Sequence, residues 1–235
     1  MNEIKPIKQA RREVYKNHFL RDVSYLFNIE ASSLFASKLL ELKELGQSLG
    51  LKIKEYSTGE DSFILGTKQN SYVLMSSRLL TIRADAAEYK NFDIFSSVIT
   101  PFVSAYADVL DVSSINAVVI IKNNDFILHR DNDLAKKISL EQYCNSLFSE
   151  KFRSQHTPSG VTKLARNVNV SAKYTSTLSD AEYKVELLVG CVDNNFCEVK
   201  SLGKRLVNAN NAIFDMWSFA ISKELKDILN KENES

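Results

Sequence analysis

The stretch "FDMWSFAIS" (residues 214–222) has an echo in "FDIFSSVIT" (residues 92–100), with Phe, Asp, Ser and Ile at matching positions. Each stretch belongs to a longer run in which apolar residues recur at spacings of three and four, the period of an amphipathic helix. These positions are Phe92, Phe95, Ile99, Phe102, Tyr106 and Val109 in the first run, and Phe214, Trp217, Ile221, Leu225 and Ile228 in the second. The chain is therefore expected to contain two long, aromatic-rich helices that cover a core.

The first of these helices follows a set of strand patterns. Residues 12–28 predict a long strand, and residues 31–49 predict an amphipathic helix that stops at Gly50. Four short runs come next, "LKIKEY", "SFILGT", "SYVLMS" and "RLLTIRA", with turn-forming residues between them. Because parallel strands need long crossover connections, this close spacing predicts an antiparallel meander.

The second half of the chain repeats that outline. "SINAVVIIK" (residues 114–122) predicts a central strand, since it is apolar on both faces. A capping box at Ser139 and Gln142 predicts a helix over "LEQYCNSLF". Alternating apolar residues over 164–174 and 183–191 predict a hairpin that turns at "TLSDA", and residues 201–229 predict the closing helix.

The predicted fold class is thus α+β, with antiparallel sheet and long amphipathic helices packed on one face of it. Residues 1–235 are expected to form a single compact unit, with structural halves at 12–110 and 111–230 that each run strand, helix, strands, helix. Duplication, chance likeness between amphipathic helices, and convergence on one packing role all stay open as origins of the echo. Pro101 predicts a kink, or two abutting helices, near Thr100.

Composition restricts the classes of function. Thirty basic and 29 acidic side chains give a net charge of +1, whereas dedicated duplex-binding proteins usually carry a clear basic excess. No apolar run approaches the roughly 20 residues that cross a bilayer, and no apolar signal segment follows the N-terminal charges. The three cysteines do not form the framework of a disulfide-rich secreted protein. A cytoplasmic protein without a membrane partner is expected.

Two segments resemble a known family. "LMSSRLLTIRADAAEYKNFDIFSSVITPFVSAYADVL" and "NANNAIFDMWSFAIS" are similar to the middle and the closing segment of a sporadically distributed family of uncharacterised bacterial proteins of about this length. The resemblance runs loosely over the whole chain and is carried by structural positions, so it implies no reaction and no catalytic residue. Relatives carry an Arg-Tyr-Asn stretch where this chain has "SSINAVVII". The sporadic distribution implies an accessory or defence-type role.

Local catalytic motifs are missing from the sequence. "HRDNDLAK" (residues 129–136) is similar to a protein-kinase catalytic loop, but Lys136 stands where the metal-binding Asn is required. Cys191 and Cys197 lack the paired spacing of a structural zinc site, and the three histidines are scattered. No catalytic residue, metal ligand or cofactor is predicted, although a site assembled from distant residues stays open.

Six basic residues form two clusters and are the candidate contacts for phosphates or for an acidic partner. They are Lys8, Arg11 and Arg12 near the N-terminus, and Arg153, Lys163 and Arg166 around a Pro-Ser-Gly turn. A solvated chain end and a mobile surface loop are the alternative interpretations of the two clusters.

These features favour a non-enzymatic bacterial protein that binds another macromolecule, with a protein partner expected, as a component of an accessory or defence-type system. A nucleic-acid-binding protein that uses the six basic residues is the first alternative. A hydrolase or nuclease with a dispersed site is the second. Self-association is also expected, because the edges of a sheet must be paired or protected.

Overall fold

A computed structural model of the chain describes residues 2–3, 20–30, 32–48, 62–66, 71–129, 159–178, 182–223 and 226–227. The first half contains β2 (Leu20–Ile29), α1 (Leu39–Ser48), β3 (Ser62–Gly66), β4 (Tyr72–Ser76), β5 (Leu79–Asp85), α2 (Ala86–Tyr89) and α3 (Phe92–Val109). The second half contains β6 (Ser114–His129), β7 (Ser159–Ala165), β8 (Val168–Leu178), β9 (Glu182–Asp193), β10 (Cys197–Glu198), a 3-10 turn (Val199–Ser201) and α7 (Leu202–Ala220). A two-residue strand, β1 (Asn2–Glu3), precedes both.

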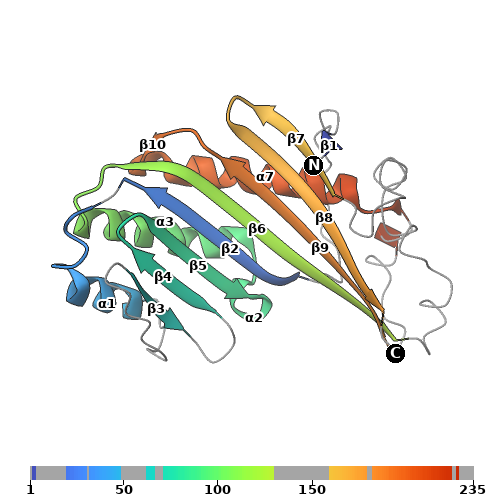
Figure 1. Ribbon diagram of the computed structural model, residues 1–235, viewed down its shortest axis with the longest axis horizontal. Helices are drawn as coiled ribbons and strands as arrows, with labels where there is room; N and C mark the ends of the chain where they lie inside the picture. Colours follow the sequence, from blue (N-terminus) through green and yellow to red (C-terminus); the bar gives the residue numbers. More distant parts are fainter. Residues whose placement is uncertain are drawn as a thin grey trace.

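These elements form the predicted α+β fold, a ten-stranded sheet with the long helices α3 and α7 on one side (Figure 1). The strand order is β1-β7-β8-β9-β6-β2-β5-β4-β3, and β10 pairs with β6. Every pair is antiparallel except β1–β7. The antiparallel meander predicted from the short runs of the first half is therefore confirmed for β3, β4 and β5.

The topology of the two halves is the same. The first half adds its strands in the order β2-β5-β4-β3 and the second in the order β6-β9-β8-β7, and β2 and β6 pair with each other at the centre. The echoed stretches do not occupy equivalent places, however. Phe92 is the first residue of α3, whereas Phe214 lies in the second half of α7. The two halves share a strand order, but the two similar stretches do not lie at equivalent positions in it.

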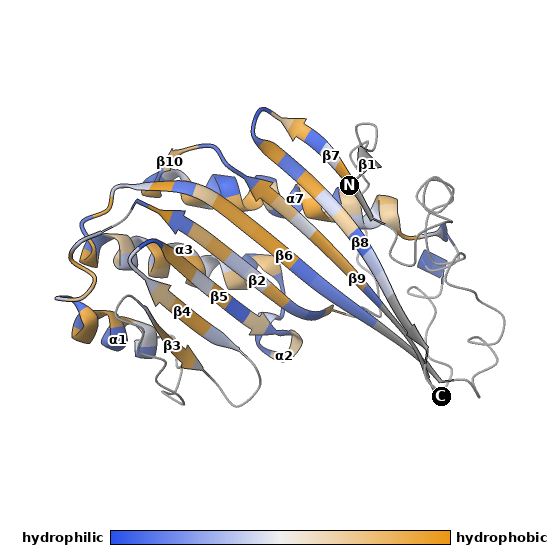
Figure 2. Cartoon of the chain, in the orientation of Figure 1, coloured by the Kyte–Doolittle hydropathy of each residue, from blue (hydrophilic) through white to orange (hydrophobic). Residues whose placement is uncertain are grey.

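Alternation along the strands explains which face is covered. On β2, the side chains of Val23, Tyr25 and Phe27 are fully buried under the helices, and the residues between them point to the other side. Helix α7 buries the stripe Leu202, Leu206, Ala209, Ile213 and Met216 against the same core. Figure 2 shows the apolar residues concentrated in the middle of the strands, with β6 becoming hydrophilic towards one end.

Several boundaries differ from the sequence-based expectation. Helix α3 continues through the exposed Pro101, so two abutting helices do not form. Helix α1 begins at Leu39, because residues 33–38 form turns. Helix α7 ends at Ala220, where Ile221 turns to an extended backbone. Of the predicted stripe, Phe214 and Trp217 are half-buried and Ile221 is buried in the core, whereas Leu225 and Ile228 lie outside the described residues. Residues 12–19, "LKIKEY" and the helix predicted over residues 140–148 lie outside the described residues.

Polar contacts help to tie α7 to the sheet. Arg205 Nε donates to Asp193 Oδ2 (2.6 Å) and Arg205 Nη2 donates to Asp193 Oδ1 (2.7 Å), with both residues buried. Lys122 Nζ on β6 donates to Asn210 Oδ1 (2.8 Å). Together they fix the helix over β9 and β6. Among the described helices, none has the length and apolar character that a membrane crossing needs.

Candidate functional site

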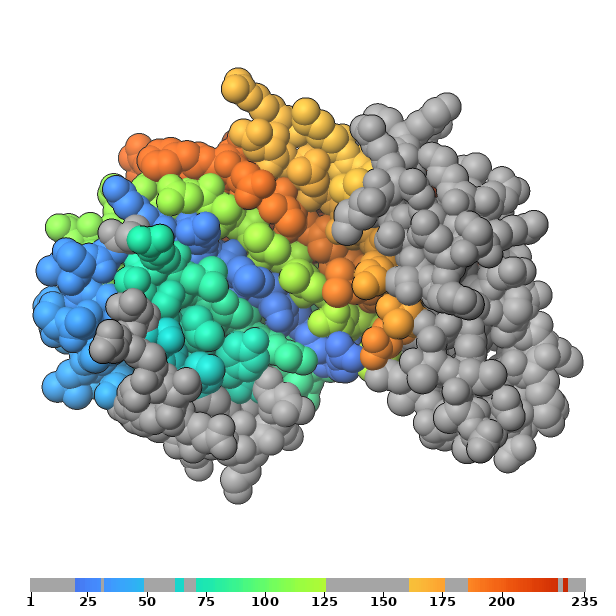
Figure 3. Space-filling model, in the orientation of Figure 1, coloured from blue at the N-terminus to red at the C-terminus, as the bar shows by residue number. Residues whose placement is uncertain are grey.

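The face of the sheet opposite α3 and α7 is called here the helix-free face. In Figure 3 the strands β4, β5, β2, β6 and β9 lie side by side on this face, with no described helix in front of them. Its side chains are those that alternate with the core positions, such as Leu26 on β2 and Val119 on β6, both half-buried.

A row of side chains crosses the helix-free face at right angles to the strands. The strand register places Leu74, Thr81, Leu26, Val119, Val192, Asn169 and Lys163 next to one another in that order. We call this the cross-sheet row. Neighbouring strands are about 4.8 Å apart, so the row extends over roughly 30 Å. It is mainly aliphatic over the centre of the sheet and ends in an amide and a cation on β8 and β7.

Four residues before Leu26 on β2, Asp22 organises a polar network. Its carboxylate is almost fully buried and accepts hydrogen bonds from Arg21 Nε (2.8 Å), Arg83 Nη2 (2.9 Å) and Asn123 Nδ2 (2.7 Å). Burial alone would raise the pKa of Asp22, but the hydrogen bonds of Arg21 and Asn123 and the charge of Arg83 outweigh it and hold the pKa below its ordinary value. Asp22 is therefore a permanent anion at neutral pH.

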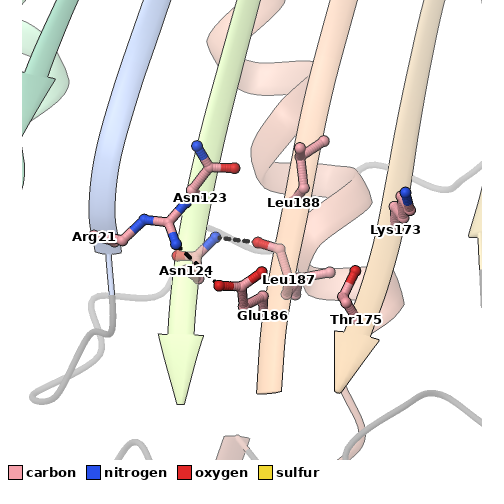
Figure 4. Close-up of a pocket in the computed structure, with 8 residues that line it drawn as sticks. All are labelled: Arg21, Asn123, Asn124, Lys173, Thr175, Glu186, Leu187 and Leu188. Carbon is pink, nitrogen blue, oxygen red and sulfur yellow. Dashed lines mark hydrogen bonds and ion pairs between the residues drawn. The ribbon is translucent and has the colours of Figure 1, made fainter. Parts of the chain in front are cut away.

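Arg21 extends this network across the central strands. Its Nη1 lies 3.2 Å from the carboxylate of Asp125 on β6 and 3.1 Å from Glu186 Oε1 on β9. A pocket of about 230 Å³ opens beside it, lined by Arg21, Asn123, Asn124, Lys173, Thr175, Glu186, Leu187 and Leu188 (Figure 4). The lining combines an acid, two cations, amides and a hydroxyl group. Such a mixed surface suits recognition of polar groups better than it suits an apolar cofactor.

The β7–β8 hairpin forms the basic end of the helix-free face. Lys163, Arg166 and Lys173 are all exposed, and residues 159–178 contain no Asp or Glu. Lys163 lies opposite Asn169 and Lys173 lies opposite Leu188, so both lysines belong to the helix-free side. Arg166 occupies the turn between the two strands. The hairpin therefore carries three cations with no acid of its own.

The structure brings together part of the basic set predicted from sequence. Lys163 and Arg166 lie on the same hairpin, although Lys163 is in a strand rather than in a loop. Lys8, Arg11, Arg12 and Arg153 lie outside the described residues. Lys173 was not predicted as a contact. Two sequence features could have predicted Lys173 as a contact. Residues 159–178 contain no acidic side chain, and the two-residue period of the strand places Lys173 on the side away from the core.

The described residues contain no group of three or more His, Cys, Asp or Glu that could hold a metal ion. Cys191 and Cys197 are both free thiols, and burial, together with the nearby Asp193, raises the pKa of Cys191 to about 12. His129 ends β6, and His18, His156 and Cys144 fall outside the described ranges. The carboxylates of Asp22, Asp125 and Glu186 form ion pairs with Arg21.

Comparison with known proteins assigns neither a family nor a function to the chain. No family model and no curated protein sequence matches the chain. Among solved structures, Clostridium acetobutylicum aspartate kinase, described as an important allosteric enzyme for industrial amino acids production, is similar at 9% identity and a TM-score of 0.23. The match covers 88% of this chain and 34% of that one. At this level the likeness carries no argument about fold or function.

Proposed function

We propose that the chain is a non-enzymatic binding protein that holds a protein partner against the helix-free face of its sheet. The observation that carries the proposal is the cross-sheet row. Four aliphatic side chains, Leu74, Leu26, Val119 and Val192, stand in register across the sheet, half-buried, without a described helix over them. Contiguous apolar surface rimmed by polar groups is typical of protein interfaces.

The polar network supports a binding role for the same face. A general acid or base working near neutral pH needs a pKa close to that pH. Asp22 is shifted the other way, because Arg21 and Asn123 stabilise its charged form. A fixed set of ion pairs around the buried Asp22 restricts the orientation of a partner instead. A cytoplasmic location and a part in an accessory or defence-type system belong to the same proposal.

Site-specific photo-crosslinking in the producing cell tests the proposal. A photoreactive amino acid replaces Asn28, which is exposed on β2 among the helix-free residues, or Asn208, which is exposed on α7 and serves as the matched control. We expect a discrete adduct with one protein from position 28 and none from position 208. Adducts from position 208 alone, or identical patterns from both positions, would contradict the proposal.

Two other adducts would identify the alternatives. A product with the mass of two chains from position 28 would make the partner a second copy of the protein. A nuclease-sensitive product from that position would replace the protein partner by nucleic acid, the first alternative interpretation of the basic residues. The hydrolase or nuclease alternative is tested separately, by turnover of chromogenic esters and of labelled oligonucleotides by the purified protein.

A further inference from the structure

We infer that the partner docks on the basic end of the helix-free face through an acidic segment that also carries aliphatic side chains. This inference rests on the proposed function and specifies the chemistry of the partner. It follows from charge, from strand register and from the kinds of side chain that this end of the sheet presents.

Charge complementarity is the first argument. The β7–β8 hairpin carries Lys163, Arg166 and Lys173 and no acid, and all three side chains are exposed. None of the three forms an ion pair with a described residue, whereas Arg21 on the same face is held by Asp22, Asp125 and Glu186. Within the described part of the chain these three cations have no carboxylate partner, and their field attracts an incoming carboxylate.

Register supplies the second argument. Val192 is followed along the cross-sheet row by Asn169 and then by Lys163, so Lys163 is two strands, or roughly 10 Å, beyond the last aliphatic side chain. Two rows further along the strands on the same face, Lys173 lies directly opposite Leu188. Each lysine thus shares a row with an aliphatic residue. A partner that places Leu or Val over Val192 or Leu188 brings its flanking carboxylates to the ammonium groups.

The described strand positions of this end of the face carry no aromatic ring, which favours a protein segment over a nucleic acid. Proteins that hold single strands stack the bases on aromatic side chains. Along the described parts of β5, β2, β6, β9, β8 and β7, the helix-free positions hold aliphatic, polar and charged residues and no Phe, Tyr or Trp. Tyr72 occupies a helix-free position on β4, and Arg83 lies over its ring, 6.0 Å from the centroid. Phe196, which is 68% exposed, lies in the turn after β9 and not at a strand position of this face. The face offers methyl groups and cations rather than a stacking platform.

Binding of labelled probes to the full chain, followed by fluorescence anisotropy, tests the inference. The probes are a short Leu-Glu repeat peptide, the matching Leu-Lys and Ser-Glu peptides, and an oligo-dT of similar length. We expect the Leu-Glu peptide to bind most tightly, the Ser-Glu peptide to bind more weakly because it lacks the aliphatic contacts, and the Leu-Lys peptide not to bind. Tighter binding of oligo-dT or of the Leu-Lys peptide would overturn the inference.

Charge reversal then locates the site. In K163E/K173E, affinity for the Leu-Glu peptide should fall about tenfold or more, because like charges now face each other. The control K204E/K223E reverses two exposed lysines of the helix side and its C-terminal flank and changes the net charge equally; it should bind as the wild type does. Thermal unfolding of both variants confirms that they are folded. Unchanged affinity in folded K163E/K173E would refute the docking site, and if the adduct at position 28 persisted, the proposed function would still stand.

Discussion

Asp22 is a single residue on which the centre of the helix-free face depends. Its carboxylate is nearly inaccessible and is shared by Arg21, Arg83 and Asn123, which belong to three different strands. Its folded pKa is lowered, so in the window between the folded and the unfolded pKa the unfolded chain binds more protons. The stability that Asp22 contributes is complete above about pH 4 and is lost as the pH falls through the folded pKa.

Replacement of this carboxylate by an amide should therefore destabilise the protein. We expect Asp22→Asn to lower the free energy of unfolding at neutral pH by about 2 kcal/mol, since two guanidinium groups lose their charged acceptor. The variant should also lose part of the acid dependence of stability. Urea unfolding at neutral and acidic pH measures both effects, and Glu44→Gln, at an exposed position of α1, is the control. Equal stabilities of the two variants would contradict the role given to Asp22.

We predict that the thiol of Cys191 reacts very slowly with alkylating reagents in the native protein. It is fully buried and its pKa is raised to about 12, first by burial and then by Asp193. Because the thiolate is the reactive species, iodoacetamide at neutral pH should modify Cys191 at least about 100-fold more slowly in the native protein than in denaturant. Peptide mass spectrometry resolves it from the half-buried Cys197. Similar rates in the native and unfolded states would show that the thiol is accessible.

At the scale of elements, the Arg205–Asp193 pair holds α7 on β9. A lysine keeps the charge but cannot make the two parallel hydrogen bonds of the guanidinium group. Arg205→Lys should lower the free energy of unfolding by about 2 kcal/mol. The converse change at the neighbouring exposed position, Lys204→Arg, should be neutral. Chemical unfolding compares the two, and a neutral Arg205→Lys would mean that the paired hydrogen bonds of the guanidinium group do not help to hold α7.

Gly46 sets how closely α1 approaches the sheet. A Cβ at this position would overlap Cδ1 of Leu65 and lie 3.2 Å from Met75 Cε, and both neighbours are buried. Overpacking of this kind costs about 1–3 kcal/mol, which exceeds the gain of about 1 kcal/mol in helix propensity. Gly46→Ala should therefore destabilise the protein. Gly203→Ala, where the nearest atom is 3.9 Å away, should be neutral or stabilising in the same thermal unfolding assay.

The elements that sequence predicted well are those whose apolar pattern is set by the core. Residues 114–122 read as a central strand because β6 is covered by helices on one side and carries Val119 and Ile121 on the other. The sequence pattern did not predict residues 159–163 as part of a strand. The described side chains of β7 include several exposed residues and show no alternation that marks a buried face. Helix α7 was predicted too long, because nothing in the local pattern marks the change of backbone at Ile221.

At the scale of the molecule, the sequence was enough to predict the repeated order of elements, but not the pair of strands that joins the two halves. Element order predicted two similar halves, whereas the pairing of β2 with β6 is a long-range choice that no local pattern encodes. The same limit applies to the site. Lys163 and Arg166 were found as a local cluster, but Lys173 joins them only through hairpin pairing. Arg21 and its partners Asp125 and Glu186 lie on three different strands, so no local pattern joins them.

The central claim is that the helix-free face, and not the helix layer, is the surface that a partner covers. Hydroxyl-radical footprinting of the complex purified from the producing cell, compared with the free protein, measures this directly. We predict that labelling falls at Leu26 and Val119 and stays unchanged at Val207, which is 44% exposed on α7. Protection of Val207 with unchanged labelling of Leu26 and Val119 would contradict the account.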